Sequence, residues 1–561
     1  MAEQVILPPK YYLDYFWFLL EFVQRLYGHI LDESEQNFIK NFELLSEDAQ
    51  CLFVRMSNRQ GSFFRTQKLK YVEIDDINAA LYELKYSQLI EDLSEEHAGY
   101  SEEILNLFTK DEWLKMAPAT TFPLRTLKKP ELVRFLLLEF GFENLVQGIN
   151  EAEPVVKVCA EIEVMMFKFL FFGNRYADMT EFVVRDIGKV NFERFREDSY
   201  TAHFANRAEA EQKLMISLTN EAFSELKETA QPPEDIYHWF MNWNASIHSL
   251  CEVARPSYDR LVCKVAMYLE RQKFANQALT VYQLTDQIPS RERRVRLLHK
   301  LGLIDEATAL CQDIANTPQN ADERFFVIDF QEKLNSTKKR PVKSVTKMLQ
   351  EAESVKIPVE FRRKVEQGVV EYFLEKGHEA VHAENYPWRG LFGLVFWDII
   401  YDTNVQAIHH PLQRAPSDFH KPDFFVKRED ALKQRLSELT DTSIFLNHIE
   451  KTFTEKFGTA NVLVDWSEVL LLLVQVIVSH LTVNQLAEIL IEMGRNLREN
   501  THGFADLMVW SENGLELIEV KSPTDHLSAQ QLHWLQFLEN IGVKARVLRV
   551  EWDYSSSGSP L

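Results

Sequence analysis

The chain has 561 residues, of which 46% are apolar and 26% charged, so it is long enough to fold into several globular domains. Its five cysteines are scattered and form no Cys-x-x-Cys pair, which argues against a zinc site or a disulfide framework and suits a reducing compartment. The net charge of −22 argues against a uniformly basic nucleic-acid binder, so nucleic acid would have to follow local basic stretches.

The sequence also argues against a membrane protein. Its first residues lack the basic-then-apolar pattern of a secretory signal. The longest apolar run, from Val469 to Val478, is interrupted by Gln475 and is too short to cross a bilayer. We therefore predict a buried helix at this run and no membrane partner.

The first hundred residues predict helices and a basic surface. Apolar periodicity predicts helices at 11–27 and 47–55, with Ser46 as the N-cap of the second. The stretch 55–70 that follows contains no acid, and its cations are Arg55, Arg59, Arg65, Lys68 and Lys70. Because two phenylalanines lie among these cations, the stretch is suited to gripping phosphates and stacking bases. The alternative is a solvated loop whose phenylalanines, Phe63 and Phe64, belong to the core.

Residues 101–245 read as mainly helical, with a Pro/Thr-rich joint at 117–125 between helices at 103–108 and 129–140. An apolar helix is predicted at 161–172 and a short strand at 181–184. The helices around the joint resemble a SAP-type helix–loop–helix, a small DNA-contacting unit. This resemblance implies a basic face with Arg125, Lys128 and Lys129. The alternative is a helical hairpin packed into the body.

Residues 246–375 repeat a helix-pair texture, with helices predicted at 263–272, 274–284, 291–301 and 305–314. Small residues such as Ala275 and Ala278 suit close helix packing. The pattern resembles tetratricopeptide-type pairs without a clean period. Such arrays usually bind proteins or act as struts, so this region predicts a protein partner or a mechanical role.

The strongest functional pattern is a hairpin whose two β-forming runs flank the turn Ser511–Gly514. If all four turn residues form the loop, Asp506 lies opposite Glu519, and Lys521 follows on the same face. A two-residue loop at 513–514 also keeps these three residues on one face, whereas an odd-length loop does not. The other face is apolar and suits a core; it carries Leu507, Val509, Ile518 and Val520.

Two carboxylates and a lysine on one strand pair have a chemical use. Hard divalent cations such as Mg²⁺ take one or two protein carboxylates and share their other positions with water and substrate phosphate. A metal held by Asp506 and Glu519 would polarise a phosphoryl oxygen and activate a water. Lys521 would orient that water or neutralise charge that develops on the phosphate. The alternative is a surface hairpin with ordinary charges.

These residues carry a resemblance to a known family. Ala505-Asp506 with Glu519-Val520-Lys521 resembles the PD-(D/E)xK nuclease motif, and residues 521–534 resemble its VRR-NUC branch. The family's usual proline is Ala505 here, which bears on strand geometry. Gln531 matches the family's helix glutamine near the site, and it also fits a capping box with Ser528.

A second match lies upstream, where His382-Ala383-Glu384-Asn385 precedes an apolar helix predicted at 388–401. This segment resembles the one that supplies another acidic ligand in the Fanconi-associated nuclease family. The resemblance implies that Glu384 joins Asp506 and Glu519 at the metal and that the carbonyl of Val520 completes the coordination. From the residues alone, Glu384 is equally suited to the dipole of the helix that follows. Asp398 is predicted as a buried polar group and not as a ligand.

The family resemblance extends to residues 52–71 and implies a fold class. We expect a multidomain chain, mainly α in its N-terminal and middle regions, with a C-terminal α/β domain of the PD-(D/E)xK, restriction-endonuclease-like type. The expected divisions are a helical DNA-binding domain at 1–100, a SAP-like and connecting region at 101–245, a tetratricopeptide-like region at 246–375 and a VRR-NUC domain at 376–561.

The resemblance also implies a function. We expect a Mg²⁺- or Mn²⁺-dependent DNA nuclease that cuts 5′ flaps and degrades from 5′ ends in interstrand crosslink repair. Its partner would be branched DNA, in a bacterial cytoplasm at the nucleoid or in a eukaryotic nucleus. Asp506, Glu519, Lys521 and Gln531 would form the catalytic site. The alternatives are a Holliday-junction resolvase, an activity found among stand-alone VRR-NUC proteins, and a non-catalytic scaffold for repair proteins.

Overall fold

The computed structural model describes residues 7–335 and 343–555. The chain divides into two compact units. Unit 1 comprises Met1–Lys189 and Ala202–Leu214, and unit 2 comprises Val190–Thr201 and Met215–Leu561. No helix in the described part of the chain is both long and apolar enough to cross a membrane.

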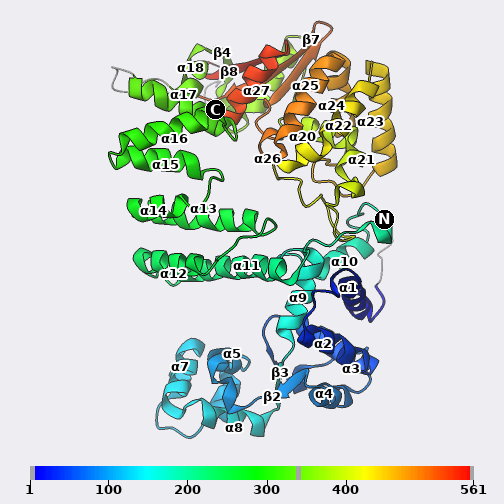
Figure 1. Ribbon diagram of the computed structural model, residues 1–561, viewed down its shortest axis with the longest axis vertical. Helices are drawn as coiled ribbons and strands as arrows, with labels where there is room; N and C mark the ends of the chain where they lie inside the picture. The colour runs from blue at the N-terminus through cyan, green and yellow to red at the C-terminus, as the bar shows by residue number, and fades with distance from the viewer. Residues whose placement is uncertain (1–6, 336–342, 556–561) are drawn as a thin grey trace, which may run out of the picture. The chain divides into compact units, whose positions relative to one another are not determined.

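Unit 1 is helical with a small antiparallel sheet, in which β3 lies between β1 and β2. Figure 1 colours this unit from blue to cyan. Its elements are α1 (Tyr11–Tyr27), α2 (Glu33–Glu43), α3 (Glu47–Ser57), β1 (Phe63–Arg65), η1 (Thr66–Lys68), α4 (Ile77–Tyr86), β2 (Ile90–Asp92), η2 (Glu95–Tyr100), α5 (Ser101–Asn106), α6 (Lys110–Met116), η3 (Leu124–Thr126), α7 (Lys129–Phe140), α8 (Phe142–Ala152), β3 (Val155–Val158), α9 (Glu161–Phe172), α10 (Thr180–Asp186) and the start of α11 (Arg207–Glu228).

Local sequence signals explain where the first helices of unit 1 begin. Asp32 and Glu35 form a reciprocal capping box at the start of α2, and Ser46 accepts a hydrogen bond from the N–H of Ala49 at the start of α3, as predicted. Aromatic rings then hold the helices together, because Phe16 of α1 packs edge-on against Phe42 of α2. The predicted helix at 11–27 is confirmed with the same bounds.

Unit 2 begins with packed helix pairs. Figure 1 shows α13 to α17 in green, each beside the next. The helical elements before the sheet are η4 (Glu197–Ser199), the remainder of α11, α12 (Pro233–Ala245), α13 (Arg255–Arg271), α14 (Ala275–Tyr282), α15 (Ser290–Lys300), α16 (Ile304–Asn316), α17 (Ala321–Asn335) and α18 (Ser344–Glu351). The four helices predicted between 263 and 314 are therefore confirmed as helices.

The rest of unit 2 is an α/β domain around a five-stranded mixed sheet of order β4-β8-β7-β6-β5. The two pairs that include β8 are parallel, and the pairs β5–β6 and β6–β7 are antiparallel. Its elements are β4 (Glu353–Pro358), η5 (Val359–Arg363), α19 (Val365–Glu375), β5 (Glu379–His382), α20 (Tyr386–Val395), α21 (Trp397–Ile400), η6 (Thr403–Val405), α22 (Asp423–Glu438), α23 (Thr442–Lys456), α24 (Glu468–His480), α25 (Val483–Arg495), α26 (Leu497–Asn500), β6 (Leu507–Ser511), β7 (Gly514–Lys521), α27 (Ala529–Asn540) and β8 (Lys544–Asp553).

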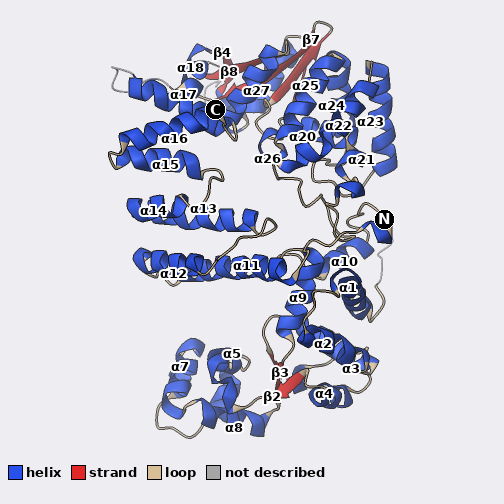
Figure 2. Cartoon of the chain, in the orientation of Figure 1, coloured by secondary structure: helices blue, strands red, loops and turns tan. Residues whose placement is uncertain are grey.

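Both faces of this sheet are covered, as Figure 2 shows for the red strands among blue helices. One face packs against Val369 and Phe373 of α19. The other packs against a larger cluster that includes Trp388 of α20, Val474 of α24 and Trp534 of α27. The predicted helix at 469–478 is confirmed as part of α24, but it is buried on one side only, since Val469 and Leu472 are exposed. The predicted fold class, helical regions followed by an α/β domain, is confirmed.

Three local predictions were wrong. Residues 181–184 belong to the helix α10 and not to a strand, because Phe182 packs into a ring cluster with Tyr15. The predicted helix at 388–401 breaks at Phe396 into α20 and α21. Asp398 of α21 is exposed and pairs with Arg435 at 2.6 Å, so it is not a buried polar group.

Candidate active site

The hairpin of β6 and β7 sets the geometry of the candidate site. Trp510 pairs with Leu515 and Leu507 with Ile518, which places Asp506 and Glu519 at the next position of the same register. The ladder runs one pair further than expected, to Ser511 and Gly514, so the loop itself is Glu512–Asn513. The predicted register is confirmed. The predicted apolar face is also confirmed, since its four members are buried against α19.

Glu519 is the most buried charged group of the site, with none of its surface exposed. Its Oε1 accepts hydrogen bonds from Nζ of Lys521 at 2.7 Å and from Nε2 of Gln531 at 2.5 Å. Its Oε2 has no hydrogen-bond donor among the residues that the structure describes. Burial and, next, the carboxylate of Asp506 raise the pKa of Glu519 to about 8.

Asp506 is partly buried beside Glu519 and is held by the backbone of β7. Its Oδ2 accepts the N–H of Val520 at 2.8 Å. Burial raises the pKa of Asp506, and the nearby carboxylates of Glu384 and Glu366 add to the shift. A second negative charge at this site is therefore costly unless a cation accompanies it.

Lys521 and Gln531 form a hydrogen-bonded bracket around Glu519. Nζ of Lys521, whose residue is only 8% exposed, also donates to Oε1 of Gln531 at 3.3 Å. The same Oε1 accepts the N–H of Ser528 at 2.9 Å in the capping box that starts α27. The predicted capping box with Ser528 is therefore confirmed, and the same Gln531 side chain also contacts Glu519 and Lys521.

Glu384 lies just after β5, the strand that pairs with β6 on the side away from β7. The N–H groups of Ala383 and Glu384 both donate to the carbonyl of Asp506, at 2.8 and 3.1 Å. Glu384 itself has φ of +43°, a left-handed conformation that is rare for residues with a side chain and is often found at functional sites. Glu384 also lines a cleft of about 640 Å³ with Tyr386, Arg389 and Asp465.

Sequence reasoning gave no role to His382, which the structure places beside Glu384. The ligand atoms of His382, Glu384 and Asp506 all lie within 4.8 Å of one another. The signal available in the sequence was the spacing His-x-Glu at the end of a strand, followed by an apolar helix. Glu366 of α19 was also missed, because nothing local connects a helix residue to a strand more than a hundred positions away.

The donor set fits a hard divalent cation. Carboxylate oxygens are the ligands that Mg²⁺ and Mn²⁺ prefer, and the carboxylate of Asp506 lies near those of both Glu384 and Glu519. Glu519 offers a buried oxygen that no described residue donates to, and Asp506 and Glu519 both have raised pKa values that a bound cation would offset. Glu384, Asp506 and Glu519 could each give an oxygen, while the predicted ligand role of the Val520 carbonyl stays a prediction.

The predicted DNA-binding residues of the basic stretch have different surroundings. Arg59, Lys68 and Lys70 are exposed. Arg55 donates to Glu73 and lies over the ring of Tyr12, and Arg65 donates to two carboxylates. The expectation that the interleaved phenylalanines stack bases was wrong, because both are buried; their exposed fractions are 2% for Phe63 and 8% for Phe64.

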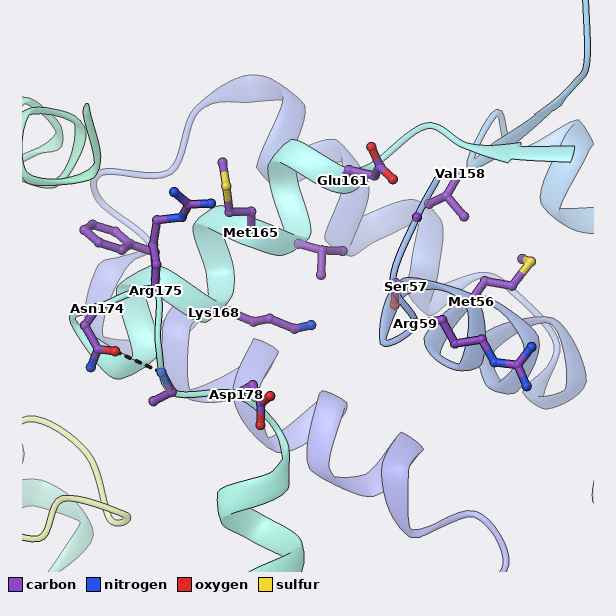
Figure 3. A pocket seen from close by; sticks show the side chains of 14 residues that line it. Met56, Ser57, Arg59, Val158, Glu161, Met165, Lys168, Asn174, Arg175 and Asp178 are labelled. Carbon is purple, nitrogen blue, oxygen red and sulfur yellow. Dashed lines mark hydrogen bonds between the residues drawn. The ribbon is translucent and has the colours of Figure 1, made fainter. Parts of the chain in front are cut away.

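Arg59 lines a cavity of about 320 Å³ together with residues of α9 and the loop after it. Figure 3 shows Lys168 extending from α9 across this cavity toward Ser57 and Arg59. Burial lowers the pKa of Lys168, whose Nζ donates to Oδ1 of Asn58 at 2.9 Å. Sequence reasoning did not bring these two cations together, because they lie on segments 109 positions apart.

The predicted basic face of the SAP-like pair lies elsewhere in unit 1. Arg125 and Lys128 are exposed, whereas Nζ of Lys129 donates to the carbonyl of Asn106 at 2.9 Å. None of these three lines the cavity of Arg59. Their DNA contacts, like those of the basic stretch, stay predictions.

Comparisons with known proteins match both units. The family model described as the FAN1 HTH domain matches residues 10–91, and the VRR-NUC domain matches residues 443–552. The Fanconi-associated nuclease 1 homolog of Pseudomonas aeruginosa is 26% identical over 97% of this chain and 96% of its own length. The homolog of Arabidopsis thaliana is 26% identical over 98% of this chain and 68% of its own length.

A solved structure agrees with these relatives. The crystal structure of paFAN1 bound to DNA with a 5′ flap of 2 nucleotides and a gap superposes with a TM-score of 0.82 at 25% identity. The superposition covers 98% of this chain and 100% of that one. Two matched domains and full-length likeness in sequence and fold lead to one conclusion. This chain is similar to the Fanconi-associated nucleases over almost its whole length, and residues 443–552 of its second unit match the VRR-NUC domain.

Proposed function

We propose that this chain is a divalent-metal-dependent, structure-selective DNA nuclease that cuts 5′ flaps and degrades DNA from 5′ ends. One observation carries the proposal: the buried carboxyl of Glu519, beside Asp506 and Lys521, has an oxygen with no donor among the described residues and a pKa raised to about 8. Such a group is destabilising in an unliganded protein and is stabilised by a bound cation.

The ligands in this proposal are Glu384, Asp506 and Glu519, with the carbonyl of Val520. When bound, Mg²⁺ or Mn²⁺ would lower the pKa of a water and neutralise charge on the phosphate. The hydrogen bond from the Val520 N–H fixes Oδ2 of Asp506, so the other oxygen, Oδ1, keeps its lone pairs for the cation. Gln531 and Lys521 hold Oε1 of Glu519 in the same way and leave its Oε2 available.

In this proposal Lys521 acts on the reacting atoms. Its ammonium group has three hydrogens, and Oε1 of Glu519 and Oε1 of Gln531 accept two of them. The third can donate to the attacking water or to a phosphate oxygen, and the positive charge offsets the negative charge that develops there. Gln531 is a positioning residue in this scheme, because it orients Lys521 and Glu519.

The substrate part of the proposal rests on the relatives. The structure of paFAN1 named above holds 5′-flap DNA, which supports branched DNA as the partner of this chain as well. Arg59, Lys68, Lys70, Arg125 and Lys128 are exposed cations of unit 1 that suit contacts with the phosphate backbone. A role in interstrand crosslink repair, a protein partner for α13–α17 and the fourfold domain division at about 100, 245 and 375 complete the proposal.

The test is cleavage of a labelled panel that contains single strand, duplex, 5′ flap, 3′ flap and four-way junction. Each DNA is incubated with Mg²⁺, Mn²⁺ or EDTA and with wild type, Asp506→Asn or Lys521→Ala. We expect metal-dependent cutting of the 5′ flap that both substitutions abolish. Preference for the four-way junction would favour a resolvase, and DNA binding without any cutting would favour a scaffold.

A further inference from the structure

One side chain beside the proposed carboxylate ligands could bind a metal through a different kind of atom. Glu384, Asp506 and Glu519 offer oxygen, whereas His382 offers an imidazole nitrogen. Nε2 of His382 lies 3.4 Å from Oε1 of Glu384, and its nearest ligand atom lies within 4.8 Å of those of both Glu384 and Asp506. We infer that His382 is an additional metal ligand that biases the site toward Mn²⁺ over Mg²⁺. This inference rests on the metal dependence proposed above.

The backbone fixes His382 at the edge of the site. His382 is the last residue of β5 and pairs with Leu507, the residue after Asp506. The next two residues hydrogen-bond through their N–H groups to the carbonyl of Asp506, so the chain turns there around the aspartate. Rigid β pairing on one side and this turn on the other therefore hold the imidazole and the two carboxylates together.

A metal ion can reach this group of ligands from solvent. The side chains of His382 and Glu384 are 49% and 52% exposed, in contrast to the fully buried Glu519. Glu384 also faces the open cleft of about 640 Å³ that His382 lines. The ligand set thus has a buried, oxygen-only side and an exposed side that contains the imidazole.

Coordination chemistry connects the imidazole to metal choice. Mg²⁺ favours oxygen ligands in strict octahedral geometry, whereas first-row transition ions accept imidazole readily. Mn²⁺ accepts both donor types, so a site with three carboxylates and one imidazole holds it more tightly than the carboxylates alone do. The same nitrogen gives Mg²⁺ little, because that ion replaces water by nitrogen reluctantly.

An ordinary surface ion pair is the alternative for His382 and Glu384. An ion pair alone would leave metal affinity unchanged when the imidazole is replaced by an amide of similar size. It would also place no nitrogen next to a bound ion. Both differences can be measured without a cleavage assay.

The test uses the full chain without DNA, loaded with Mn²⁺. Pulsed electron paramagnetic resonance is expected to detect a ¹⁴N nucleus coupled to the ion in wild type, and the coupling is expected to vanish in His382→Gln. Mn²⁺ affinity, titrated by the signal of the free ion, is expected to fall about tenfold. Mg²⁺ affinity, measured by competition, is expected to change less than about threefold.

Two control variants separate this inference from the proposed function. His378→Gln removes an imidazole just before β5 that is not part of the ligand group, and it should leave the ¹⁴N coupling intact. Asp506→Asn should lose Mn²⁺ binding altogether. If Asp506→Asn loses Mn²⁺ while His382→Gln keeps the coupling and the affinity, the inference about His382 is overturned and the metal site stands. If Asp506→Asn binds Mn²⁺ like wild type, the proposed metal site itself is overturned.

Discussion

Two clusters of this molecule combine one cation with two carboxylates but shift carboxyl pKa values in opposite directions. In unit 1, Arg65 lies between Glu112 and Glu153. In unit 2, Lys521 lies against Glu519, with Asp506 beyond it. Each cluster has one cation for two carboxylates. Each also leaves one buried carboxylate oxygen without a donor in the described part of the chain, Oε1 of Glu153 and Oε2 of Glu519.

The two clusters differ in how the cation reaches the acids. The planar guanidinium of Arg65 donates to both carboxylates at once, through Nη1 and Nη2 to Glu112 and through Nε to Glu153. Arg65 thereby lowers the pKa of Glu112 to about 2. The ammonium of Lys521 reaches only one of its acids, and further carboxylates face the other, so both pKa values rise. The sign of the pKa shift, and not the unpaired oxygen alone, separates a closed structural cluster from one that needs another cation.

The largest expected effect is a loss of cleavage when charges of the cluster around Lys521 are removed. If the proposed mechanism holds, Asp506→Asn and Lys521→Ala should each lower the rate of flap cleavage by about 10³-fold or more, because each removes a group that the proposal assigns to the reacting phosphate. Single-turnover cleavage measures this, and circular dichroism should show an unchanged fold. Asp398→Asn is the matched control, since it makes the same change at an exposed ion pair of the same unit. Loss of activity in the control as well would mean that any charge change disables the enzyme.

Removing the cation of the cluster around Arg65 should lower the stability of the fold. Arg65→Ala leaves two acids without their shared cation, and the side chain of Glu153 is only 6% exposed. We expect the free energy of unfolding of unit 1 to fall by about 2–4 kcal/mol. Lys521→Met should cost far less stability near neutral pH, because carboxyls with raised pKa values can take up a proton. Chemical denaturation of both variants checks this, and equal losses of stability would mean that the two cations stabilise the fold equally.

A pH series sharpens the comparison further. The pKa of Glu519 is about 8 in the fold and near its ordinary value of 4.5 when unfolded, so the folded state binds the extra proton. The stability that this proton contributes is complete below about pH 4.5 and is lost as the pH rises through 8. Without metal, the free energy of unfolding of Glu519→Gln relative to that of wild type should therefore rise by about 1–3 kcal/mol between pH 5 and pH 8. Thermal unfolding in EDTA measures the difference, and a gap that shrinks with pH would contradict the raised pKa.

The clusters also show what a sequence can reveal. The Glu519–Lys521 pattern could be predicted, because alternation along a strand and the turn residues fix which side chains share a face. The ion pairs of Arg65 could not be predicted, since Glu112 and Glu153 lie 47 and 88 positions away and nothing local marks them as partners. For the same reason the acids that pair with Arg55 and Arg65 could not be seen from the stretch 55–70, which contains no acid of its own.

Long-range pairing also explains the other misses. The sheet of unit 1 joins β1 to β3 across about ninety residues, and each strand is too short to show a clear alternation. His382 was visible in the sequence, but its nearness to Asp506 depends on the pairing of β5 with β6. Local signals such as the caps at Ser46 and Ser528 were sufficient for helix boundaries, because those hydrogen bonds span only three residues.

A smaller effect is expected where one residue serves both structure and site. Gln531→Ala should lower cleavage by about tenfold and stability by about 1 kcal/mol, because it removes a cap and the bracket around Lys521 and Glu519. Ser528→Ala removes only the cap, so it should cost similar stability and leave the cleavage rate within about twofold. Cleavage rates and unfolding temperatures of the two variants separate the role of Gln531 as a helix cap from its role in positioning Lys521 and Glu519. Equal activity in both would mean that Gln531 acts only as a cap.

The smallest effect concerns the exposed cations of the basic stretch. Lys68 and Lys70 are exposed and form no ion pair with the residues that the structure describes, so Lys68→Gln/Lys70→Gln should leave stability unchanged and weaken DNA binding about three- to tenfold. Each lost phosphate contact should also reduce the slope of log affinity against log salt by about 0.9. Lys433→Gln on α22, an exposed i,i+4 pair with Glu429, is the matched control and should change neither quantity. An unchanged slope in the double variant would mean that neither lysine contacts a DNA phosphate. Arg59 would then be the remaining candidate for such a contact in the stretch, since Arg55 and Arg65 already neutralise acids of their own unit.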